Sequence, residues 1–323
     1  MDQIIKVVVL GDPADPTLRI LDRLGAGVEL KIAKTADGLG TSLTDAEVLF
    51  NWSGSRAEIQ AILQRAPRLK WIHTRSAGLD SLLCQELVES AVLLTNGSGT
   101  FSQSLGEFVI AGALYWAKDM PRMLKAKSEH RWDVFDVFEL STQTMGIVGH
   151  GDIGRAIARR AKAFGMKVLA LRRDPSPRYG DEDVDSVYQT KDLHRMLPEC
   201  DYVAVAAPLT PETKHLMSTA EFNCMKSSAI VMNVGRGPVI DEAAMAEALR
   251  TRRIRGATLD VFEVEPLPAT SPLWDLDNVF ISAHTADHTQ SWLDDAITVF
   301  VEQFSRWRNA EMLMNLVDKK AGY

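Results

Sequence analysis

The feature of this sequence that most constrains its fold is a regular alternation of short apolar runs with segments of helical length. The runs of the first third are IIKVVVL (4–10), VELKIA (28–33), AEVLF (46–50), LKWIHT (69–74) and AVLLT (91–95). Segments such as 55–65 and 80–89, which separate these runs, are long enough to form helices. Strands separated by helices indicate parallel β-α-β units rather than hairpins.

A second series of the same kind follows a long segment, 102–129, whose apolar residues recur at helical spacing. Its runs are TMGIVGHG (144–151), MKVLAL (166–171), DYVAVAAP (201–208), AIVMNVG (229–235), GATLDVF (256–262) and NVFISAH (278–284). Helical spacing returns at 290–309. Two successive series predict an α/β chain with two parallel-sheet domains, and the boundary falls near GSGTF at 97–101.

Composition excludes several classes of protein. The 323 residues are 46% hydrophobic and carry a formal net charge of −7, which argues against a general nucleic-acid binder. No apolar run approaches the length that spans a bilayer, and the first residues read as a strand rather than a signal peptide. Three widely spaced cysteines, Cys84, Cys200 and Cys224, predict neither disulfides nor a zinc site. We expect a cytoplasmic protein without membrane or nucleic-acid partners.

A glycine-rich turn marks the second series as the dinucleotide-binding one. GIVGHGDIG places Gly149, Gly151 and Gly154 in G-x-G-x-x-G spacing, after an expected strand and before an expected helix. The first glycine permits a tight turn, the second allows backbone N–H groups to approach a pyrophosphate, and the third allows the helix to pack on the strand. The corresponding VVVLGDPADP of the first series lacks the later glycines, and its prolines lack N–H donors.

Three later stretches place charged residues after expected strands. Arg236 lies between two glycines in NVGRGPVID, Asp260 and Glu265 lie in LDVFEVEP, and His284 lies in ISAHTAD. The carboxyl ends of parallel strands line the ligand crevice of such folds, so Arg236, Glu265 and His284 could meet near a cofactor.

With these motifs the sequence resembles the D-isomer-specific 2-hydroxyacid dehydrogenases, which include phosphoglycerate dehydrogenases and glyoxylate/hydroxypyruvate reductases. The matching stretches are WIHTRSAGLD, GIVGHGDIGRAIA, FGMKV, PLTPETKHLM, NVGRGPVIDE, LDVFEVEPLP with SPLW, and ISAH. The resemblance implies two Rossmann-like or flavodoxin-like domains with the active site in the cleft between them. It places a substrate-binding domain at 1–98, a dinucleotide-binding domain at 99–284, and a return to the substrate domain at 285–323.

The resemblance also implies residue roles. Arg236 matches the arginine that binds the substrate carboxylate and carbonyl, His284 matches the catalytic acid–base histidine, and Glu265 matches its acidic partner. These residue types suit hydride addition to a 2-keto carbon. A guanidinium stabilises the negative charge that develops on the keto oxygen, and an imidazolium supplies a proton to it. The substrate carboxylate is expected at the backbone of Ser76, Ala77 and Gly78. Ala283 stands where the family usually has proline, which removes no functional group.

A larger set of residues is implied in cofactor binding. Its members are Gly149, Gly151, Asp152, Ile153, Gly154, Arg172, Arg173, Ala207, Pro208, Thr213, Val234 and Asp260. His288 follows His284 by four residues, but no third ligand accompanies them, so no metal site is expected.

Arginines stand where the family's acid usually binds the adenosine ribose. Counted from Phe164, the position at the end of the strand is Arg172, and Arg173 follows it. A guanidinium attracts the 2′-phosphate that a carboxylate would repel, so we expect NADP(H) to be preferred, with NAD(H) possible. In an alternative interpretation Asp174 takes the role of the acid and the arginines form a solvated corner.

The resemblance leaves two functions of different kinds. The first is an NAD(P)H-dependent reductase of small 2-keto acids, of the glyoxylate or hydroxypyruvate type, acting as a homodimer. The alternative is a dehydrogenase-like interaction protein of the corepressor type with little turnover, which the lack of long polar arms disfavours. Glu265 disfavours a formate dehydrogenase, which has glutamine there. The sequence does not select the 2-keto acid, and the roles of residues 51–54 and of Trp132 stay open.

Overall fold

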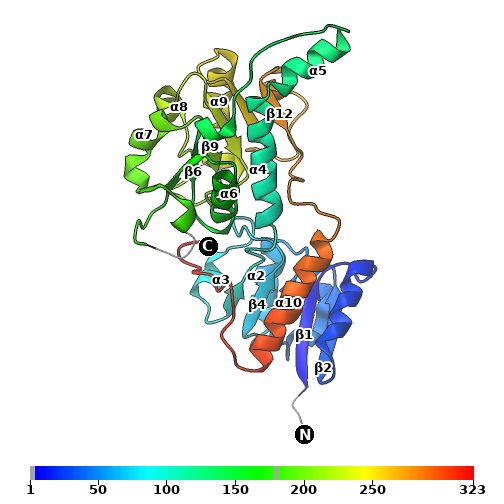
Figure 1. Ribbon diagram of the computed structural model, residues 1–323. Helices are drawn as coiled ribbons and strands as arrows, with labels where there is room; N and C mark the ends of the chain where they lie inside the picture. Colours follow the sequence, from blue (N-terminus) through cyan, green and yellow to red (C-terminus); the bar gives the residue numbers. More distant parts are fainter. Residues whose placement is uncertain (1–3, 178–180) are drawn as a thin grey trace. The chain divides into compact units, whose positions relative to one another are not determined.

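The computed structural model describes residues 4–177 and 181–323, and the chain divides into two compact units. Unit 1 extends to Phe101 and resumes with Gln290–Tyr323, and unit 2 is Ser102–Thr289. The chain thus leaves unit 1 after one sheet and returns to it with a last long helix (Figure 1). These changes of unit come after residues 101 and 289, where the sequence analysis placed changes of domain after 98 and 284.

Unit 1 contains a five-stranded parallel sheet in the order β2-β1-β3-β4-β5. Its strands are β1 (Ile5–Leu10), β2 (Val28–Ala33), β3 (Val48–Asn51), β4 (Trp71–Thr74) and β5 (Leu93–Thr95). This is the flavodoxin-like order, in which the chain reverses direction across the sheet beside β1. The five apolar runs of the first series are therefore confirmed as strands.

Two layers cover the sheet of unit 1. Its helical elements are η1 (Pro16–Leu24), α1 (Ala36–Leu39), η2 (Gly40–Leu43), α2 (Arg56–Arg65), α3 (Gln85–Glu89) and α10 (Trp292–Arg308). Ile59 and Ile62 of α2 pack on one face, and Leu21 of η1 and Phe300 of α10 pack on the other. The ring of Phe300 stacks on that of Phe50 at 4.2 Å between centroids. Residues from both ends of the sequence therefore form one core.

Unit 2 contains a seven-stranded parallel sheet in the order β12-β11-β10-β9-β6-β7-β8. Its strands are β6 (Thr144–Val148), β7 (Lys167–Leu171), β8 (Ser186–Tyr188), β9 (Tyr202–Val205), β10 (Ile230–Asn233), β11 (Gly256–Leu259) and β12 (Val279–Ile281). Six of them correspond to the second series of apolar runs. The sequence analysis missed β8, because a three-residue edge strand with no buried residue leaves no apolar run.

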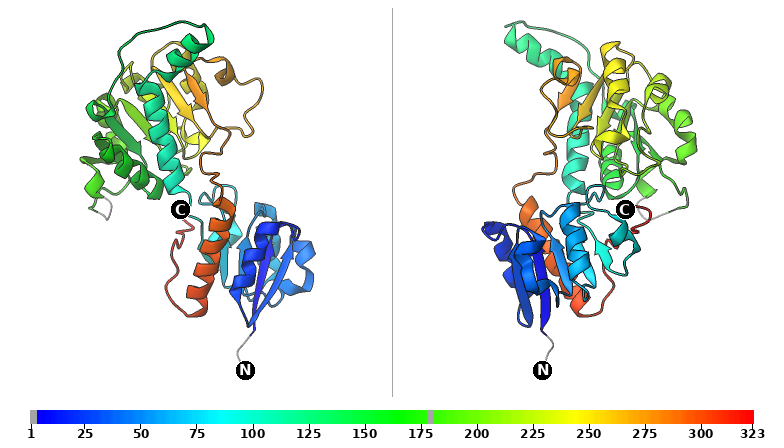
Figure 2. Two further views of the ribbon diagram at one scale, coloured as in Figure 1. Left: turned by 45° about the vertical axis from the view of Figure 1, so that its right-hand side comes forward. Right: turned by 180° about the vertical axis from the view of Figure 1, so that it is seen from behind.

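Helices cover both faces of this sheet (Figures 1 and 2). The helical elements are α4 (Ser102–Ala117), α5 (Met120–Ser128), η3 (Leu140–Thr142), α6 (Asp152–Ala163), η4 (Asp181–Asp183), η5 (Thr190–Asp192), α7 (Leu193–Met196), η6 (Leu197–Glu199), α8 (Thr219–Cys224), η7 (Gly237–Val239), α9 (Glu242–Arg250) and η8 (Pro272–Asp275). On one face α4 packs closely on α6, since a Cβ at Gly106 would lie 3.1 Å from the carbonyl of Ala156. Helices α7, α8 and α9 contribute to the core of the other face.

The helical spacing over 102–129 predicts one helix, but the structure has two, α4 and α5. Pro121 lacks an N–H group, and its ring would clash with the carbonyl four residues earlier in an unbroken helix. Asp119 takes up the change of direction with a left-handed backbone at φ 49°. In the described part of the chain, no helix combines the length and apolarity needed to cross a membrane.

A buried polar group lies inside the core of unit 1. The indole N–H of Trp71 donates to the hydroxyl of Thr95 at 2.8 Å, and Nδ1 of His73 lies 2.7 Å from the same oxygen. His73 is fully buried, and its burial lowers its pKa to about 3. The imidazole is therefore neutral in the folded protein at any pH where the protein would be studied.

We predict that His73 makes the protein sensitive to acid. The unfolded chain binds a proton on this histidine below its ordinary pKa of about 6.5, whereas the folded chain binds it only near pH 3. Between these values the free energy of unfolding should fall as the pH falls, by up to about 1.4 kcal/mol per pH unit from this group. Urea unfolding from pH 7 to pH 4 should show a shallower decline in His73→Leu than in His194→Leu, a control that changes an exposed histidine. Equal declines would contradict the prediction.

Candidate active site

The turn between β6 and α6 has the geometry of a phosphate-binding loop. Gly149 adopts φ 100°, and a Cβ on it would lie 2.6 Å from the backbone nitrogen of Ala207. A Cβ on Gly154 would lie 2.2 Å from the carbonyl oxygen of Gly149, so this glycine permits α6 to start close to β6. Above Gly151, the N-cap of α6, a Cβ would meet no atom within 4 Å. The open space at this helix N-terminus fits a phosphate group.

The sheet of unit 2 brings the other candidate residues to the same edge. In parallel strands all carboxyl ends lie together, and β6 is the point where the order of strands reverses. The residues that follow the strands are, across the edge, His284 after β12, Asp260 after β11, Arg236 after β10, Ala207 and Pro208 after β9, Gly149 after β6 and Arg172 after β7. The glycine-rich turn after β6 thus lies between two groups of strands. His284, Asp260 and Arg236 follow strands on one side of it, and Arg172 follows β7 on the other.

A carboxylate–imidazole pair forms the chemical centre of this edge. Nδ1 of His284 lies 2.7 Å from Oε2 of Glu265, and both side chains are partly exposed. The other oxygen of Glu265 accepts a hydrogen bond from the backbone N–H of Phe262 at 2.9 Å. Because a carboxylate only accepts, Nδ1 carries the hydrogen of this bond, and Nε2 is left to exchange a proton.

The backbone around His284 is held in an unusual conformation. His284 has φ 55°, a value that non-glycine residues seldom adopt. Oδ1 of Asp260 accepts hydrogen bonds from the backbone N–H groups of Thr285 at 3.0 Å and Ala286 at 3.1 Å. Asp260 is 1% exposed. Its buried carboxylate therefore fixes the loop that presents the histidine, a contact that the sequence analysis did not foresee.

Arg236 lies on a turn whose backbone is fixed by the side chain of Asn233. Asn233, which is buried, donates to the carbonyl of Arg236 at 3.1 Å and accepts from the N–H of Gly235 at 3.1 Å. Nη1 of Arg236 donates to the carbonyl of Gly235 at 2.8 Å. A Cβ on Gly237 would lie 1.9 Å from the carbonyl carbon of Phe262. This turn therefore lies directly against the segment that leads to Glu265.

The remaining residues of the implied cofactor set line the same edge with varied exposure. Ala207 and Val234 are buried. The hydroxyl of Thr213 accepts from the N–H of Thr210 at 2.8 Å and donates to the carbonyl of Pro208 at 2.6 Å, which closes the loop after β9. Asp152, at the start of α6, pairs with Arg155 one turn later, and the neighbouring Ile153 is half-buried.

Arg172 has a different environment from the solvent-facing one that its proposed role requires. Its guanidinium makes two hydrogen bonds with Asp181, from Nη1 to Oδ1 at 2.6 Å and from Nη2 to Oδ2 at 2.8 Å. Its side chain is 6% exposed, whereas Arg173 is an exposed residue. The sequence analysis missed Asp181, because the carboxylate comes nine positions after the arginine and no motif links the two.

The ring of His150 also belongs to this group. Its side chain is 1% exposed, and Nδ1 lies 3.5 Å from both Nη1 of Arg172 and Oδ1 of Asp181. Burial lowers the pKa of His150.

In unit 1 the SAGLD loop (76–80) is fixed by the two residues that follow β5. The N–H of Gly97 donates to the carbonyl of Ser76 at 3.2 Å, and the side chain of Asn96 donates to the carbonyl of Ala77 at 2.7 Å. In a trans peptide the N–H points away from the carbonyl of the same unit. The N–H groups of Ala77 and Gly78 therefore point away from the segment of Asn96 and Gly97, as a carboxylate-binding role would need.

The preceding residue, Arg75, lies between two tryptophans. Its guanidinium carbon is 4.5 Å from the ring centroid of Trp52 and 5.4 Å from that of Trp292. Trp52 is in turn anchored by a hydrogen bond of 2.9 Å from its indole N–H to Asp15. The sequence analysis named this region but ranked no residue in it, because Trp292 is more than 200 positions away from the loop.

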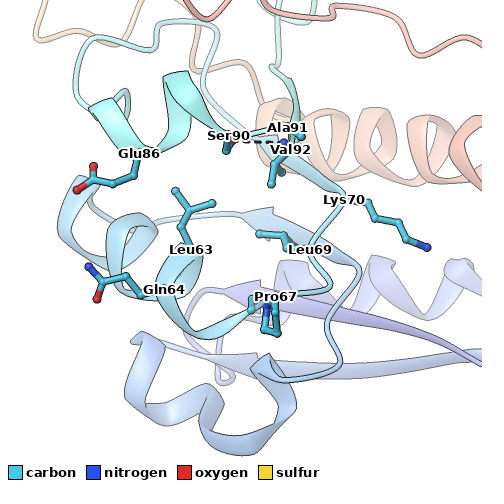
Figure 3. Close-up of a pocket in the computed structure, with 10 residues that line it drawn as sticks. Leu63, Gln64, Pro67, Leu69, Lys70, Glu86, Ser90, Ala91 and Val92 are labelled. Atoms are coloured by element: carbon cyan, nitrogen blue, oxygen red, sulfur yellow. Dashed lines mark hydrogen bonds between the residues drawn. The ribbon is translucent and has the colours of Figure 1, made fainter.

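A cavity of about 570 Å³ lies on unit 1 and contains none of these residues (Figure 3). It is lined by Leu63, Gln64, Ala66, Pro67, Leu69, Lys70, Glu86, Ser90, Ala91 and Val92. Its charged residues have partners, since Lys70 pairs with Glu47 and Glu86 accepts from Gln60. Across residues 4–177 and 181–323, no cluster of three or more histidine, cysteine or acidic side chains could hold a metal ion.

Comparisons with known proteins agree with this geometry. The family model described as D-isomer specific 2-hydroxyacid dehydrogenase, NAD binding domain, matches residues 110–286. A D-3-phosphoglycerate dehydrogenase of Methanocaldococcus jannaschii is 31% identical over 97% of this chain, which spans only 59% of that relative. A glyoxylate reductase of Korarchaeum cryptofilum is 31% identical over 80% of this chain and 79% of its own length. A glyoxylate/hydroxypyruvate reductase of Sinorhizobium meliloti, NADPH-dependent and solved with NADP and sulfate, is 26% identical with a TM-score of 0.85, covering 99% of this chain and 100% of its own.

Proposed function

The chain belongs to the D-isomer specific 2-hydroxyacid dehydrogenase family, and from this premise we propose that it reduces a small 2-keto acid with a nicotinamide dinucleotide. It is an NAD(P)-dependent oxidoreductase in which unit 2 binds the dinucleotide and unit 1 binds the substrate carboxylate. The observation that carries the proposal is the contact of 2.7 Å between His284 and Glu265, at the same sheet edge as the glycine-rich turn.

The residues of the chain supply charge and a proton for this reaction. The nicotinamide cofactor, when bound, supplies the hydride that reduces the keto carbon. His284 donates a proton from Nε2 to the oxygen that becomes negative, while Glu265 stabilises the charged imidazole and fixes its orientation. Arg236 stabilises the same oxygen with its guanidinium. The N–H groups of the Ser76–Gly78 loop bind the carboxylate and so orient the substrate.

We predict that His284→Ala loses about 10²–10⁴-fold in kcat, because it removes a general acid. Its affinity for the cofactor should stay unchanged, since the glycine-rich turn is intact. His288→Ala is the matched control, as it removes a partly exposed histidine four positions away, outside the pair with Glu265. Steady-state rates with glyoxylate and fluorescence titration of the reduced cofactor measure both effects. Near-normal turnover in His284→Ala would refute the mechanism.

The substrate is of the glyoxylate or hydroxypyruvate type. The names of the Korarchaeum and Sinorhizobium relatives support this choice. Rates with glyoxylate, hydroxypyruvate, pyruvate and phenylpyruvate would rank the substrates. A chain that binds the cofactor but reduces none of them would instead be an interaction protein of the corepressor type.

We further propose that NADP(H) is the preferred cofactor, with NAD(H) as a weaker alternative. The residues that support this preference are Arg172 directly after β7 and the exposed Arg173 beside it. Both carry positive charge at the end of the strand where the adenosine ribose binds in this fold. The Sinorhizobium relative, which was solved with NADP, gives a second line of support.

We predict that kcat/KM is higher with NADPH than with NADH by about 10- to 1000-fold, on the basis of one or two charge-assisted hydrogen bonds to the 2′-phosphate. Arg172→Asp should lose or reverse this preference, while Arg159→Asp, on the exposed side of α6, should keep it. Equal or better use of NADH by the wild-type protein would refute the preference. So would an Arg172→Asp protein that retained it.

We propose that the chain forms a homodimer through α5 and the segment that follows it. This part runs outside the rest of unit 2 (Figures 1 and 2) and exposes an unusual amount of apolar surface. Its exposed apolar side chains are Met120 (39%), Met123 (44%), Leu124 (60%), Trp132 (94%), Val134 (81%), Val137 (44%) and Phe138 (55%). Exposed apolar side chains gathered in one segment of the chain favour a protein–protein interface.

Light scattering at micromolar concentration should therefore give twice the chain mass of 35.7 kDa. Replacing both Leu124 and Trp132 with serine should weaken the dimer, because it removes two well-exposed apolar side chains of the proposed interface, 60% and 94% exposed. Trp274→Ser, which changes a 52% exposed tryptophan elsewhere in unit 2, should leave the mass unchanged. A monomeric wild-type protein would exclude the proposal.

The cysteines support a reducing location, for which we propose the cytoplasm. Cys84, Cys200 and Cys224 are all free thiols. Burial raises the pKa of Cys200 to about 12, so this thiol is unreactive.

A further inference from the structure

The guanidinium proposed to bind the cofactor's 2′-phosphate already binds an anion of its own chain. Nη1 and Nη2 of Arg172 face the two oxygens of Asp181 in the paired geometry that arginine also uses with phosphate. Nη2 donates in addition to the backbone carbonyls of Pro175 and Ser176. With the side chain 6% exposed, this end of the guanidinium is enclosed by residues of the chain.

The position of the pair makes this occupation important for cofactor binding. Arg172 follows β7 directly, next to the strand that ends in the glycine-rich turn. In this fold the residue at that point contacts the adenosine ribose. A guanidinium edge that faces a carboxylate cannot face a phosphate at the same time, because each N–H group points in one direction.

We propose that Asp181 is a specificity-determining residue that competes with the 2′-phosphate of NADP(H) for Arg172. This inference rests on the proposed function, whose cofactor preference it refines. NADPH gains the bonds to Arg172 only when Asp181 leaves them, whereas NADH binds with the pair intact. Asp181 therefore weakens NADPH binding and leaves NADH binding nearly unchanged.

The electrostatic surroundings strengthen the competition. Asp181 shares η4 with Glu182 and Asp183, so three carboxylates follow one another on this turn and would repel an incoming phosphate. Nδ1 of His150 lies 3.5 Å from both Arg172 and Asp181. The burial of this imidazole disfavours its charged form, which could offset the repulsion. The 2′-phosphate and the carboxylate of Asp181 therefore compete for the same edge of the guanidinium.

The test compares ligands with and without the phosphate in Asp181→Asn, a substitution that keeps the shape of the side chain and removes its charge. Titration of the whole protein by fluorescence or calorimetry gives Kd for NADPH, NADH, 2′,5′-ADP and 5′-AMP. We expect Kd for NADPH and 2′,5′-ADP to fall by about tenfold or more, the effect of one charge-assisted bond. Kd for NADH and 5′-AMP should change less than threefold. Asp183→Asn, on the same η4 turn but outside the pair, should give a much smaller gain.

Other results would overturn the inference. Unchanged or weaker binding of NADPH and 2′,5′-ADP by Asp181→Asn, with NADH binding intact, would show that Asp181 does not compete. Loss of affinity for all four ligands would show that Asp181 maintains the site, which is a different role. An equal gain of affinity for NADPH in Asp183→Asn would show that any loss of negative charge on η4 has this effect, without competition for Arg172. Wild-type protein that binds neither NADPH nor NADH would refute the proposed function itself, so the two failures are distinguishable.

Discussion

The parallel arrangement of the sheet in unit 2 is the constraint on which the candidate site depends. Because all seven strands run the same way, every strand ends at the same edge, and each functional segment begins where a strand ends. Gly149, Arg236 and His284 are as much as 135 positions apart in sequence, yet they follow strands of one sheet. Candidate residues that are far apart in sequence are thus brought to one edge by the pairing of strands.

Buried polar side chains then fix the segments that present the candidate residues. Asp260 holds the backbone after His284, Asn233 holds the turn of Arg236, and Asn96 holds the loop of Ala77. Each of the three is buried, and a buried polar group is tolerated only when it is hydrogen-bonded. Removing one would free a loop and leave unpaired groups behind, so these residues support the backbone of the segments that present the candidate residues.

Arg172, directly after β7, shows how the tertiary environment changes the interpretation of a residue. The sequence alone predicts that Arg172 is a cation that can bind a phosphate. In the structure it is paired with Asp181 and adjoins a buried histidine. The same arginine is therefore an ion-pair partner in the folded chain, and only the tertiary contacts reveal this.

Sequence alone determined the two parallel-sheet units, eleven of the twelve strands of the described chain, and the family, because apolar runs and glycine spacing are local patterns. It also placed Arg236, Glu265 and His284 after strands, and their catalytic roles stay predictions. Only the tertiary structure decided the break between α4 and α5, the edge strand β8, the support of the His284 loop by Asp260, and the pairing of Arg172 with Asp181. These features depend on contacts between residues that are distant in sequence or on backbone geometry at single positions, and neither leaves a periodic signal in the chain.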